Sequence, residues 1–314
     1  KVFDNNPLSI ICSLVCPHEK HCEGHCVLNK KHTPVNVGGI ENYISTYYMN
    51  YRAFEKTEQN GRNIAIIGSG PAGISLAMMM ALKGYNMTMY EANDKIGGVL
   101  RYGIPDFRLD RTILDTIEEK LKKIGVKIRK NIMIGKNITL DDMFRDDFDA
   151  VFIGTGVWRP KKLGIKGESL GNVHFAIDYL KTPKAYDLGE KVIVVGAGNV
   201  AMDVARTAIR NGAHEVSIMY RKGEEDMPAE RIEIEHAKID GVKFNLFKSP
   251  LEFSETGIKY ENTKEDDNSI AFEEADSILI AISQTARDLI VKNTTGLSLG
   301  ENGLLESDEN RVTA

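Results

Sequence analysis

Cysteine is absent from the chain after Cys26, although the chain has 314 residues. All four cysteines lie in one segment, CSLVCPHEKHCEGHC, from Cys12 to Cys26. Because Asp and Glu (45) outnumber Lys and Arg (40), there is no basic excess of the kind that binds nucleic acid or an anionic membrane. No apolar run reaches the roughly 18 residues that a membrane-spanning helix needs, and no secretory signal is visible. We therefore expect a cytoplasmic protein with no nucleic-acid or membrane partner.

Two segments repeat one pattern: a β-branched run, a glycine turn, a helix and a second strand. They are NIAIIGSGPAGISLAMMMALKGYNMTMYE, from Asn63 to Glu91, and KVIVVGAGNVAMDVARTAIRNGAHEVSIMYRK, from Lys191 to Lys222. Repeated strand–helix–strand units predict α/β domains with parallel sheets. Further helices are predicted over Ile40–Lys56 and from Ile113 to Ile124, where apolar residues have helical spacing.

The first glycine turn, G-S-G-P-A-G, contains Gly68, Gly70 and Gly73 between a strand and a helix. In dinucleotide-binding turns the first glycine makes the tight turn. The second admits a pyrophosphate and the third allows close helix–strand packing. Glu91 ends the second strand, where an acid can accept the ribose hydroxyls. A glycine turn that serves geometry alone is the alternative, but the complete context favours a dinucleotide.

The second turn, G-A-G-N-V-A, has Gly196, Gly198 and Ala201, and alanine is an accepted variant at the third position. Arg221 and Lys222 stand where the first unit has its acid. A guanidinium and an ammonium group suit a 2′-phosphate, so this unit is predicted to bind NADPH rather than NADH. The alternative is that both are ordinary solvated surface charges.

Two such units in one chain indicate two dinucleotides, a tightly held flavin and an exchangeable nicotinamide. The cofactors carry hydride transfer and the protein supplies binding and orientation, so no catalytic side chain is assigned. No convincing Ser/His/Asp triad or paired-carboxylate site is visible in the sequence.

The segment EANDKIGGVLRYGIPDFRLDR, together with GAGNVAMD, YRKGEEDMPA and VFIGTGVWRP, resembles the glutamate synthase small (β) subunit family. That family includes the N-terminal half of dihydropyrimidine dehydrogenase. The resemblance covers essentially the whole chain. It implies an FAD-binding Rossmann-like domain with an inserted NADPH domain, preceded by part of a small α-helical iron–sulfur domain.

The resemblance also implies site residues. The FAD contacts are Gly68, Gly70, Pro71, Ala72, Gly73, Glu91, Gly97, Gly98, Arg108, Thr155 and Gly156. The NADPH contacts are Gly196, Gly198, Asn199, Val200, Ala201, Arg221 and Lys222. Residues near the nicotinamide and the flavin are Ala281, Ile282 and Ser283.

The chain departs from the family pattern in three segments: Ser283 replaces a glycine, Ala286 replaces a proline, and RLDR at 108–111 stands for the more common RLPK. A surface pairing of Arg108 with Asp106 or Asp110 is the alternative to its cofactor role.

The cysteine segment allows several readings. A disulfide framework is disfavoured because no secretory signal precedes the nucleotide units. Four thiolates suit tetrahedral zinc, although the spacing is not a familiar paired knuckle. Iron–sulfur ligation suits a flavin that must release single electrons. Free or buried thiols are the remaining alternative.

The resemblance favours iron–sulfur. It implies that Cys16, Cys22 and Cys26, with Glu41, are ligands of [4Fe–4S] clusters, whereas Cys12 is not counted as one. An acid that stabilises a helix N-terminus is the other reading of Glu41. The family has a further cysteine group upstream and a flavin-contacting strand downstream of the positions present here. We therefore expect a fragment clipped at both ends, with incomplete clusters.

The predicted organisation has four parts: 1–60, partial helical iron–sulfur domain; 61–175, first part of the FAD domain; 176–285, NADPH domain; 286–314, return to the FAD domain. The predicted function is an NADPH-dependent, FAD-containing electron-input subunit of a homo- or hetero-oligomer. It passes electrons through iron–sulfur clusters to a partner oxidoreductase subunit or domain.

Two other functions compete with this prediction. A self-contained flavin disulfide reductase is disfavoured because the first Rossmann unit has no cysteine. A non-catalytic nucleotide-binding or zinc-stabilised assembly module is the alternative that remains.

Overall fold

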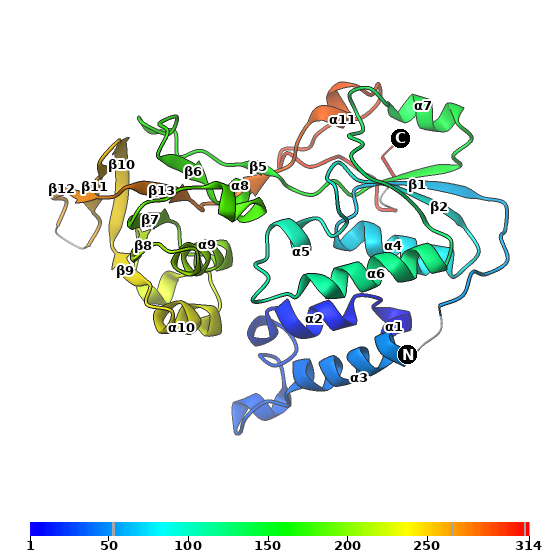
Figure 1. The fold of residues 1–314 in the computed structure, drawn as a ribbon, viewed down its shortest axis with the longest axis horizontal. Coiled ribbons are helices and arrows are strands. Elements are labelled where there is room, and N and C mark those ends of the chain that lie inside the picture. The colour runs from blue at the N-terminus through cyan, green and yellow to red at the C-terminus, as the bar shows by residue number, and fades with distance from the viewer. Residues whose placement is uncertain (52–53, 265–266, 311, 314) are drawn as a thin grey trace. The chain divides into compact units, whose positions relative to one another are not determined.

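A computed structural model describes residues 1–51, 54–264, 267–310 and 312–313. The chain forms two compact units, which are described separately (Figure 1). The first unit comprises Lys1–Arg101, Asp106–Val157 and Ala286–Ala314, and the second comprises Tyr102–Pro105 and Trp158–Thr285. Residues 158–175 thus lie in the second unit. The assignment of the four predicted parts to domains stays a prediction.

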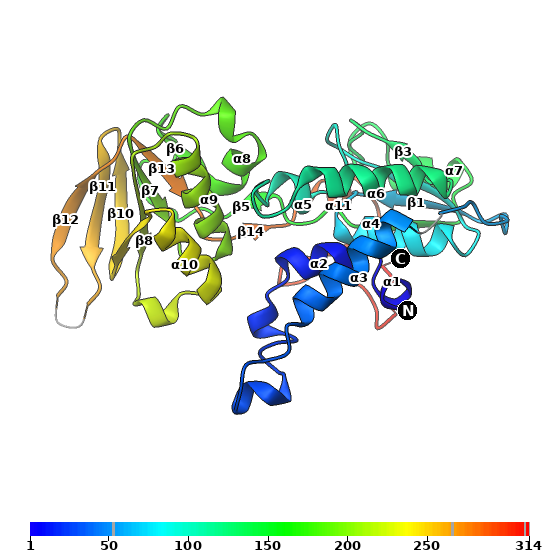
Figure 2. The same ribbon diagram turned by 60° about the horizontal axis from the view of Figure 1, so that its bottom comes forward.

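The N-terminal segment of the first unit is helical. Its elements are α1 (Val2–Asn5), α2 (Ser9–Val15), η1 (His18–Lys20), η2 (Val27–Lys30) and α3 (Val37–Tyr51). Helices α2 and α3 lie side by side, and the Ser45 hydroxyl donates a buried 2.8 Å hydrogen bond to the Ser9 hydroxyl between them (Figure 1, Figure 2).

The helix predicted over Ile40–Lys56 has different limits. It begins at Val37 because the Asn36 side chain accepts a 2.7 Å hydrogen bond from the Gly39 N–H and caps the first turn. Its described part ends at Tyr51, residues 52–53 lie outside the described residues, and residues 54–56 are not helical.

A four-stranded parallel sheet of order β3-β2-β1-β4 forms the core of the first unit. Its strands are β1 (Asn63–Ile67), β2 (Asn86–Tyr90), β3 (Lys127–Arg129) and β4 (Ala150–Ile153). The helices of this unit are α4 (Pro71–Ala81), α5 (Val99–Tyr102), α6 (Arg111–Lys123), α7 (Leu140–Arg145) and α11 (Leu289–Lys292). Alternate residues of β1 face opposite sides of the sheet, and Ala65 and Ile67 pack with residues of α7 and α11.

Helix α6 confirms the predicted spacing of apolar residues. Leu114, Ile117 and Leu121 are fully buried, and the Asp110 side chain caps the helix by accepting from the Thr112 N–H. On the same helix the buried Glu118 carboxylate pairs with Lys122 and Lys130, each at 2.6 Å.

The second unit has a five-stranded parallel sheet of order β6-β13-β7-β8-β9. Its strands are β6 (Val173–Phe175), β7 (Lys191–Val195), β8 (Glu215–Tyr220), β9 (Lys243–Leu246) and β13 (Ser277–Ile280). The helices of this unit are α8 (Ala176–Lys181), η3 (Pro183–Ala185), α9 (Asn199–Arg210), η4 (Glu224–Asp226) and α10 (Arg231–Ile239). Two short strands, β5 (Arg159–Pro160) and β14 (Gln284–Thr285), pair antiparallel.

An antiparallel sheet of β10 (Lys248–Ser254), β11 (Gly257–Asn262) and β12 (Ile270–Glu274) completes the second unit. Helices α9 and α10 cover one face of the parallel sheet and the antiparallel sheet packs on the other (Figure 1). Along β7, Val192 and Val194 belong to the core with α9, whereas Ile193 and Val195 pack with Phe253 of β10. Among the described residues, no helix has the length and apolar character needed to cross a membrane.

The ion pairs of the buried Glu118 carboxylate should make the stability of the fold depend on pH. Burial alone would raise the pKa of Glu118, but the ammonium groups of Lys122 and Lys130 outweigh it and lower the pKa. The stabilisation is therefore present above the unfolded-state pKa of about 4.3 and is lost as the pH falls through the lower folded-state value. We expect Glu118→Gln to lose less stability than the native chain between pH 7 and pH 3.5 in urea unfolding.

Glu119→Gln, at the exposed neighbouring position of the same helix, is the matched control and should behave like the native chain. Equal acid sensitivity of Glu118→Gln and the native chain would contradict the assignment.

Candidate functional site

The first glycine turn joins β1 to α4, and each of its three glycines meets a different steric demand. Gly68 has φ +100°, and a Cβ there would lie 2.4 Å from the Gly154 carbonyl oxygen at the end of β4. A Cβ on Gly73 would lie 2.1 Å from the Gly68 carbonyl oxygen. A Cβ on Gly70 would meet nothing within 4 Å. The outer glycines therefore serve turn and packing, and only the middle one faces open space.

The open space lies at the start of α4. Gly70 is the N-cap of this helix, no side chain caps it, and Pro71 occupies the first turn with Ala72. Proline suits that position because its missing N–H would have no partner within the helix. The uncapped N–H groups and the helix dipole favour an anion such as a pyrophosphate at this point.

Other predicted residues lie against the same turn. The Gly97 N–H donates to the Ser69 carbonyl at 2.9 Å, and a Cβ on Gly98 would lie 2.7 Å from the Gly70 Cα. The Cα of Thr155 would lie 3.2 Å from a Cβ on Gly68, and Gly156 follows with φ +70°. The structure therefore brings Gly97, Gly98 and Thr155 together with the turn. Arg108 is half-buried in the connection between α5 and α6.

Glu91, the acid after β2, is buried and its carboxylate is fully engaged. Its Oε2 accepts from the Ser69 N–H at 3.1 Å and from the Ser69 hydroxyl, and its Oε1 accepts from the Asn93 N–H at 2.7 Å and the Asn93 side chain at 2.8 Å. Since a carboxylate has about four lone-pair sites, a ribose hydroxyl would have to replace one of these donors. Glu91 therefore also holds the turn in its conformation.

The second turn, between β7 and α9, repeats the geometry of the first. Gly196 has φ +127°, and a Cβ there would lie 2.4 Å from the Ala281 carbonyl oxygen at the end of β13. At Gly198 only the Pro228 side chain comes within 4 Å, at 3.9 Å, and no side chain caps α9. Ala201 is fully buried at the packing position, and Val200 is half-buried beside it.

Glu230, which the sequence does not single out, holds the Asn199 side chain at the start of α9. The Asn199 amide donates to the buried Glu230 carboxylate at 2.9 Å, and its carbonyl oxygen accepts from the Glu230 N–H at 2.9 Å. Glu230 follows the MPA motif, but nothing in the motif pairs it with a residue 31 positions earlier.

Arg221 and Lys222 follow β8 and are exposed. The Lys222 ammonium lies 3.4 Å from Asp226, whereas no ion pair is found for the Arg221 guanidinium within the described part of the chain. The segment after β13 carries Ala281, Ile282 and Ser283, and the Ala281 N–H donates to the Val195 carbonyl at 2.8 Å. Ser283 has φ +154°, in the positive range that favours the glycine found there in the resembled family.

None of the four cysteines forms a disulfide among the described residues, and Cys22 is exposed. The His18 Nδ1 lies 3.3 Å from the Cys22 Sγ, and backbone N–H groups of Val35 and Leu28 lower the pKa of the Cys26 thiol. Within residues 1–51, 54–264, 267–310 and 312–313, no three His, Cys, Asp or Glu side chains are gathered to hold a metal ion. The structure therefore does not bring Cys16, Cys22, Cys26 and Glu41 together.

Two Rossmann-type units, each with a glycine turn leading into an uncapped helix, define an oxidoreductase of the two-dinucleotide class. Residues 62–314 match the pyridine nucleotide-disulphide oxidoreductase family, and residues 1–53 match dihydropyrimidine dehydrogenase domain II, 4Fe-4S cluster. The thioredoxin reductase of T. acidophilum has a similar fold, with a TM-score of 0.63, 20% identity and coverage of 80% of this chain and 87% of that one.

Curated relatives point to one branch of this family. The glutamate synthase [NADPH] small chain of Halomonas elongata is 32% identical, over 97% of this chain and 71% of that protein. The corresponding small chain of Escherichia coli is 34% identical, over 78% of this chain and 56% of that protein, so the chain spans little more than half of the latter. The chain belongs to the pyridine nucleotide-disulphide oxidoreductase family, in the branch of the glutamate synthase small chains. The predicted resemblance, the α/β fold class and the class of NAD(P)H-dependent flavin oxidoreductase are confirmed.

Gly70, which faces open space, and Gly73, which packs against the Gly68 carbonyl, should respond differently to substitution by alanine. Gly70 has φ −71° and ψ −174°, which alanine adopts readily, so Gly70→Ala should change the free energy of unfolding by no more than about 0.5 kcal/mol. Its methyl group would occupy the approach to the helix N-terminus and weaken FAD binding by about ten- to hundredfold. Gly73→Ala should instead destabilise the fold itself by about 1–3 kcal/mol.

Urea unfolding of the apoprotein and fluorescence titration with FAD measure the two effects. The assignment is wrong if Gly70→Ala binds FAD as tightly as the native protein.

Proposed function

We propose that this chain is the NADPH-oxidising, FAD-binding electron-input part of a glutamate synthase small-chain-like oxidoreductase. One observation carries the proposal: both glycine turns present an open middle glycine at the uncapped N-terminus of a long helix. That combination fits the pyrophosphate of a dinucleotide twice in the same chain. When both cofactors are bound, the nicotinamide supplies a hydride and the flavin accepts it and releases electrons singly.

We assign FAD to the unit built on β1–β4. Gly70 and Ala72 would receive the pyrophosphate, and Gly97 and Gly98 would pass along it because they lie against the turn. Glu91 would bind the adenosine ribose by exchanging the side-chain donor of Ser69 or Asn93. Arg108, Thr155 and Gly156 would complete the site, as the family resemblance implies.

We assign NADPH to the unit built on β7–β9. Gly198, Asn199, Val200 and Ala201 would receive the phosphates at the start of α9, where Glu230 holds the Asn199 side chain in place. The Arg221 guanidinium would pair with the 2′-phosphate, with Lys222 as a second positive charge. Ala281, Ile282 and Ser283 would lie near the nicotinamide.

Cys16, Cys22 and Cys26, with Glu41, would contribute to the ligands of [4Fe–4S] clusters. Thiolates are the right donors for these clusters, and the N–H groups that lower the pKa of Cys26 favour its thiolate form. Within the part of the chain that the structure describes, these side chains are not gathered into a complete ligand set. A reducing compartment such as the cytoplasm would keep these thiols out of disulfides.

The small-chain relatives are parts of larger assemblies by name, which supports a partner subunit that receives the electrons. That partner would be an oxidoreductase subunit or domain in a homo- or hetero-oligomer.

A visible spectrum of the full-length protein tests the proposal. We expect flavin bands with a broad iron–sulfur shoulder, bleached on anaerobic addition of NADPH. A colourless protein with about one zinc ion and no response to NADPH would instead support a zinc-stabilised, non-catalytic module.

The nucleotide preference gives a second test. Arg221→Glu should weaken NADP⁺ binding about ten- to hundredfold and leave NAD⁺ binding nearly unchanged, because only NADP⁺ carries the 2′-phosphate. Lys259→Glu, at an exposed position of β11 in the same unit, makes the same change in net charge and should alter neither. Titration calorimetry measures both constants, and equal losses for the two nucleotides would sink the assignment.

A further inference from the structure

Three segments far apart in the sequence meet beside Arg221. The Thr263 hydroxyl donates to the Arg221 carbonyl at 2.5 Å, and the Thr263 N–H donates to the Phe247 carbonyl at 2.8 Å. The Phe247 N–H in turn donates to the Lys222 carbonyl at 3.2 Å. These three bonds fix the backbone of Arg221 and Lys222 to the antiparallel sheet, because Thr263 directly follows β11 and Phe247 directly precedes β10.

Phe247 connects the two sheets in an uncommon backbone conformation. It links β9 of the parallel sheet to β10 of the antiparallel sheet with φ +57°, an uncommon value for a residue other than glycine. Its ring would lie 3.0 Å from a Cβ on Gly223, so the loop after Lys222 passes close to it. A larger residue at position 223 would displace this loop or the Phe247 ring.

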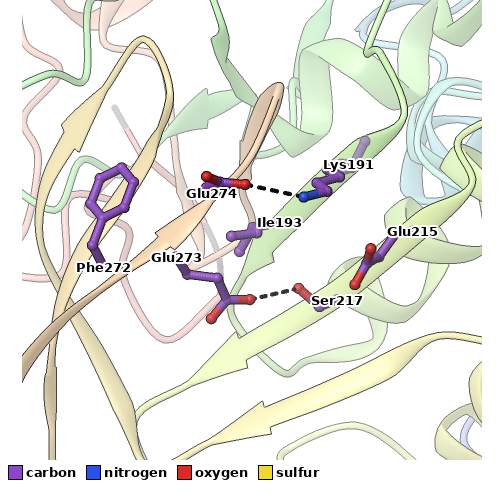
Figure 3. Close-up of a pocket in the computed structure, with 8 residues that line it drawn as sticks. Lys191, Ile193, Glu215, Ser217, Phe272, Glu273 and Glu274 are labelled. Carbon is purple, nitrogen blue, oxygen red and sulfur yellow. Dashed lines mark hydrogen bonds and ion pairs between the residues drawn. The ribbon is translucent and has the colours of Figure 1, made fainter.

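The antiparallel sheet is also joined to the parallel sheet by polar contacts of Glu273. The Glu273 side chain of β12 accepts from two residues of the parallel sheet, Ser217 of β8 at 3.5 Å and the Asn245 side chain of β9. Within the antiparallel sheet it accepts from Lys248 of β10 at 2.7 Å. Figure 3 shows Glu273 reaching Ser217 and Glu274 reaching Lys191 across a hollow at the start of β7 and β8.

Burial alone would lower the pKa of Lys248, but Glu273 and Tyr260 outweigh it and raise the pKa, so the ammonium group keeps its charge. The Lys248 ammonium also lies 4.4 Å from the centre of the Tyr260 ring. The antiparallel sheet is therefore joined to the parallel sheet through Glu273 and to the segment after β8 through Arg221.

We propose that Thr263, which directly follows β11, is a positioning residue for recognition of the 2′-phosphate by Arg221. Thr263 holds the carbonyl of Arg221 and so sets the direction in which the exposed guanidinium leaves the backbone. Bidentate pairing of a guanidinium with a phosphate depends on orientation, whereas a lysine acts as a point charge. This inference rests on the proposed NADPH site.

The test compares NADP⁺ and NAD⁺ binding by titration calorimetry in the full-length protein and three variants. Thr263→Val removes the hydroxyl but keeps the shape, and it should weaken NADP⁺ about three- to tenfold while NAD⁺ is unchanged. Thr263→Ser keeps the hydroxyl and should bind NADP⁺ like the native protein. Thr256→Val makes the same exchange in the turn between β10 and β11 and should change neither constant.

The outcomes separate the two proposals. If the native protein itself does not prefer NADP⁺ to NAD⁺, the proposed NADPH site fails. If the native protein prefers NADP⁺ and Thr263→Val keeps the full preference, the NADPH site stands and the role of Thr263 is overturned. The role of Thr263 is also overturned if Thr263→Val weakens NADP⁺ and NAD⁺ binding equally and Thr263→Ser does not restore it. A general structural defect would have that effect.

Discussion

The middle glycine of each turn is the constraint on which both sites depend. Gly70 and Gly198 are each the N-cap of a long helix that no side chain caps, and a Cβ at either would meet almost nothing of the protein. The first glycine of each turn has a different, purely structural role. Gly68 and Gly196 need a positive φ and would each collide with the carbonyl of an adjacent strand end. The fold thus uses the outer positions to bring strand and helix together and leaves the middle position open, as the proposed phosphate contact requires.

The two units differ in the charge and burial of the residue that follows their second strand. Glu91 is buried and holds the first turn through Ser69, so its carboxylate serves both the fold and the proposed ribose contact. Arg221 is exposed, and its backbone carbonyl, rather than its side chain, is fixed by the hairpin. A tightly held cofactor suits the first arrangement, and an exchangeable one suits the second, because the charged group remains accessible to solvent.

Local features of the site could be predicted from the sequence. The glycine spacing, the β-branched strands and the helical spacing of Leu114, Ile117 and Leu121 are encoded within short segments, and the structure has these elements in the expected order. The start of α3 differed by three residues because the Asn36 cap decides it rather than the apolar pattern. The contacts of Asn199 with Glu230 and of Arg221 with Thr263 join residues 31 and 42 positions apart, and no periodicity carries such pairings. The cysteine ligands stay a prediction for the same reason, since a cluster site depends on how distant segments fold together.

The most direct test of the account is hydrogen exchange by mass spectrometry on the full-length apoprotein, with FAD and NADP⁺ added separately. FAD should slow exchange in the turn and first helical residues from Ser69 to Ile74, and NADP⁺ should slow exchange from Ala197 to Met202. Protection of both turns by the same nucleotide, or of neither turn by its own, would contradict the claim that each open glycine receives a separate dinucleotide.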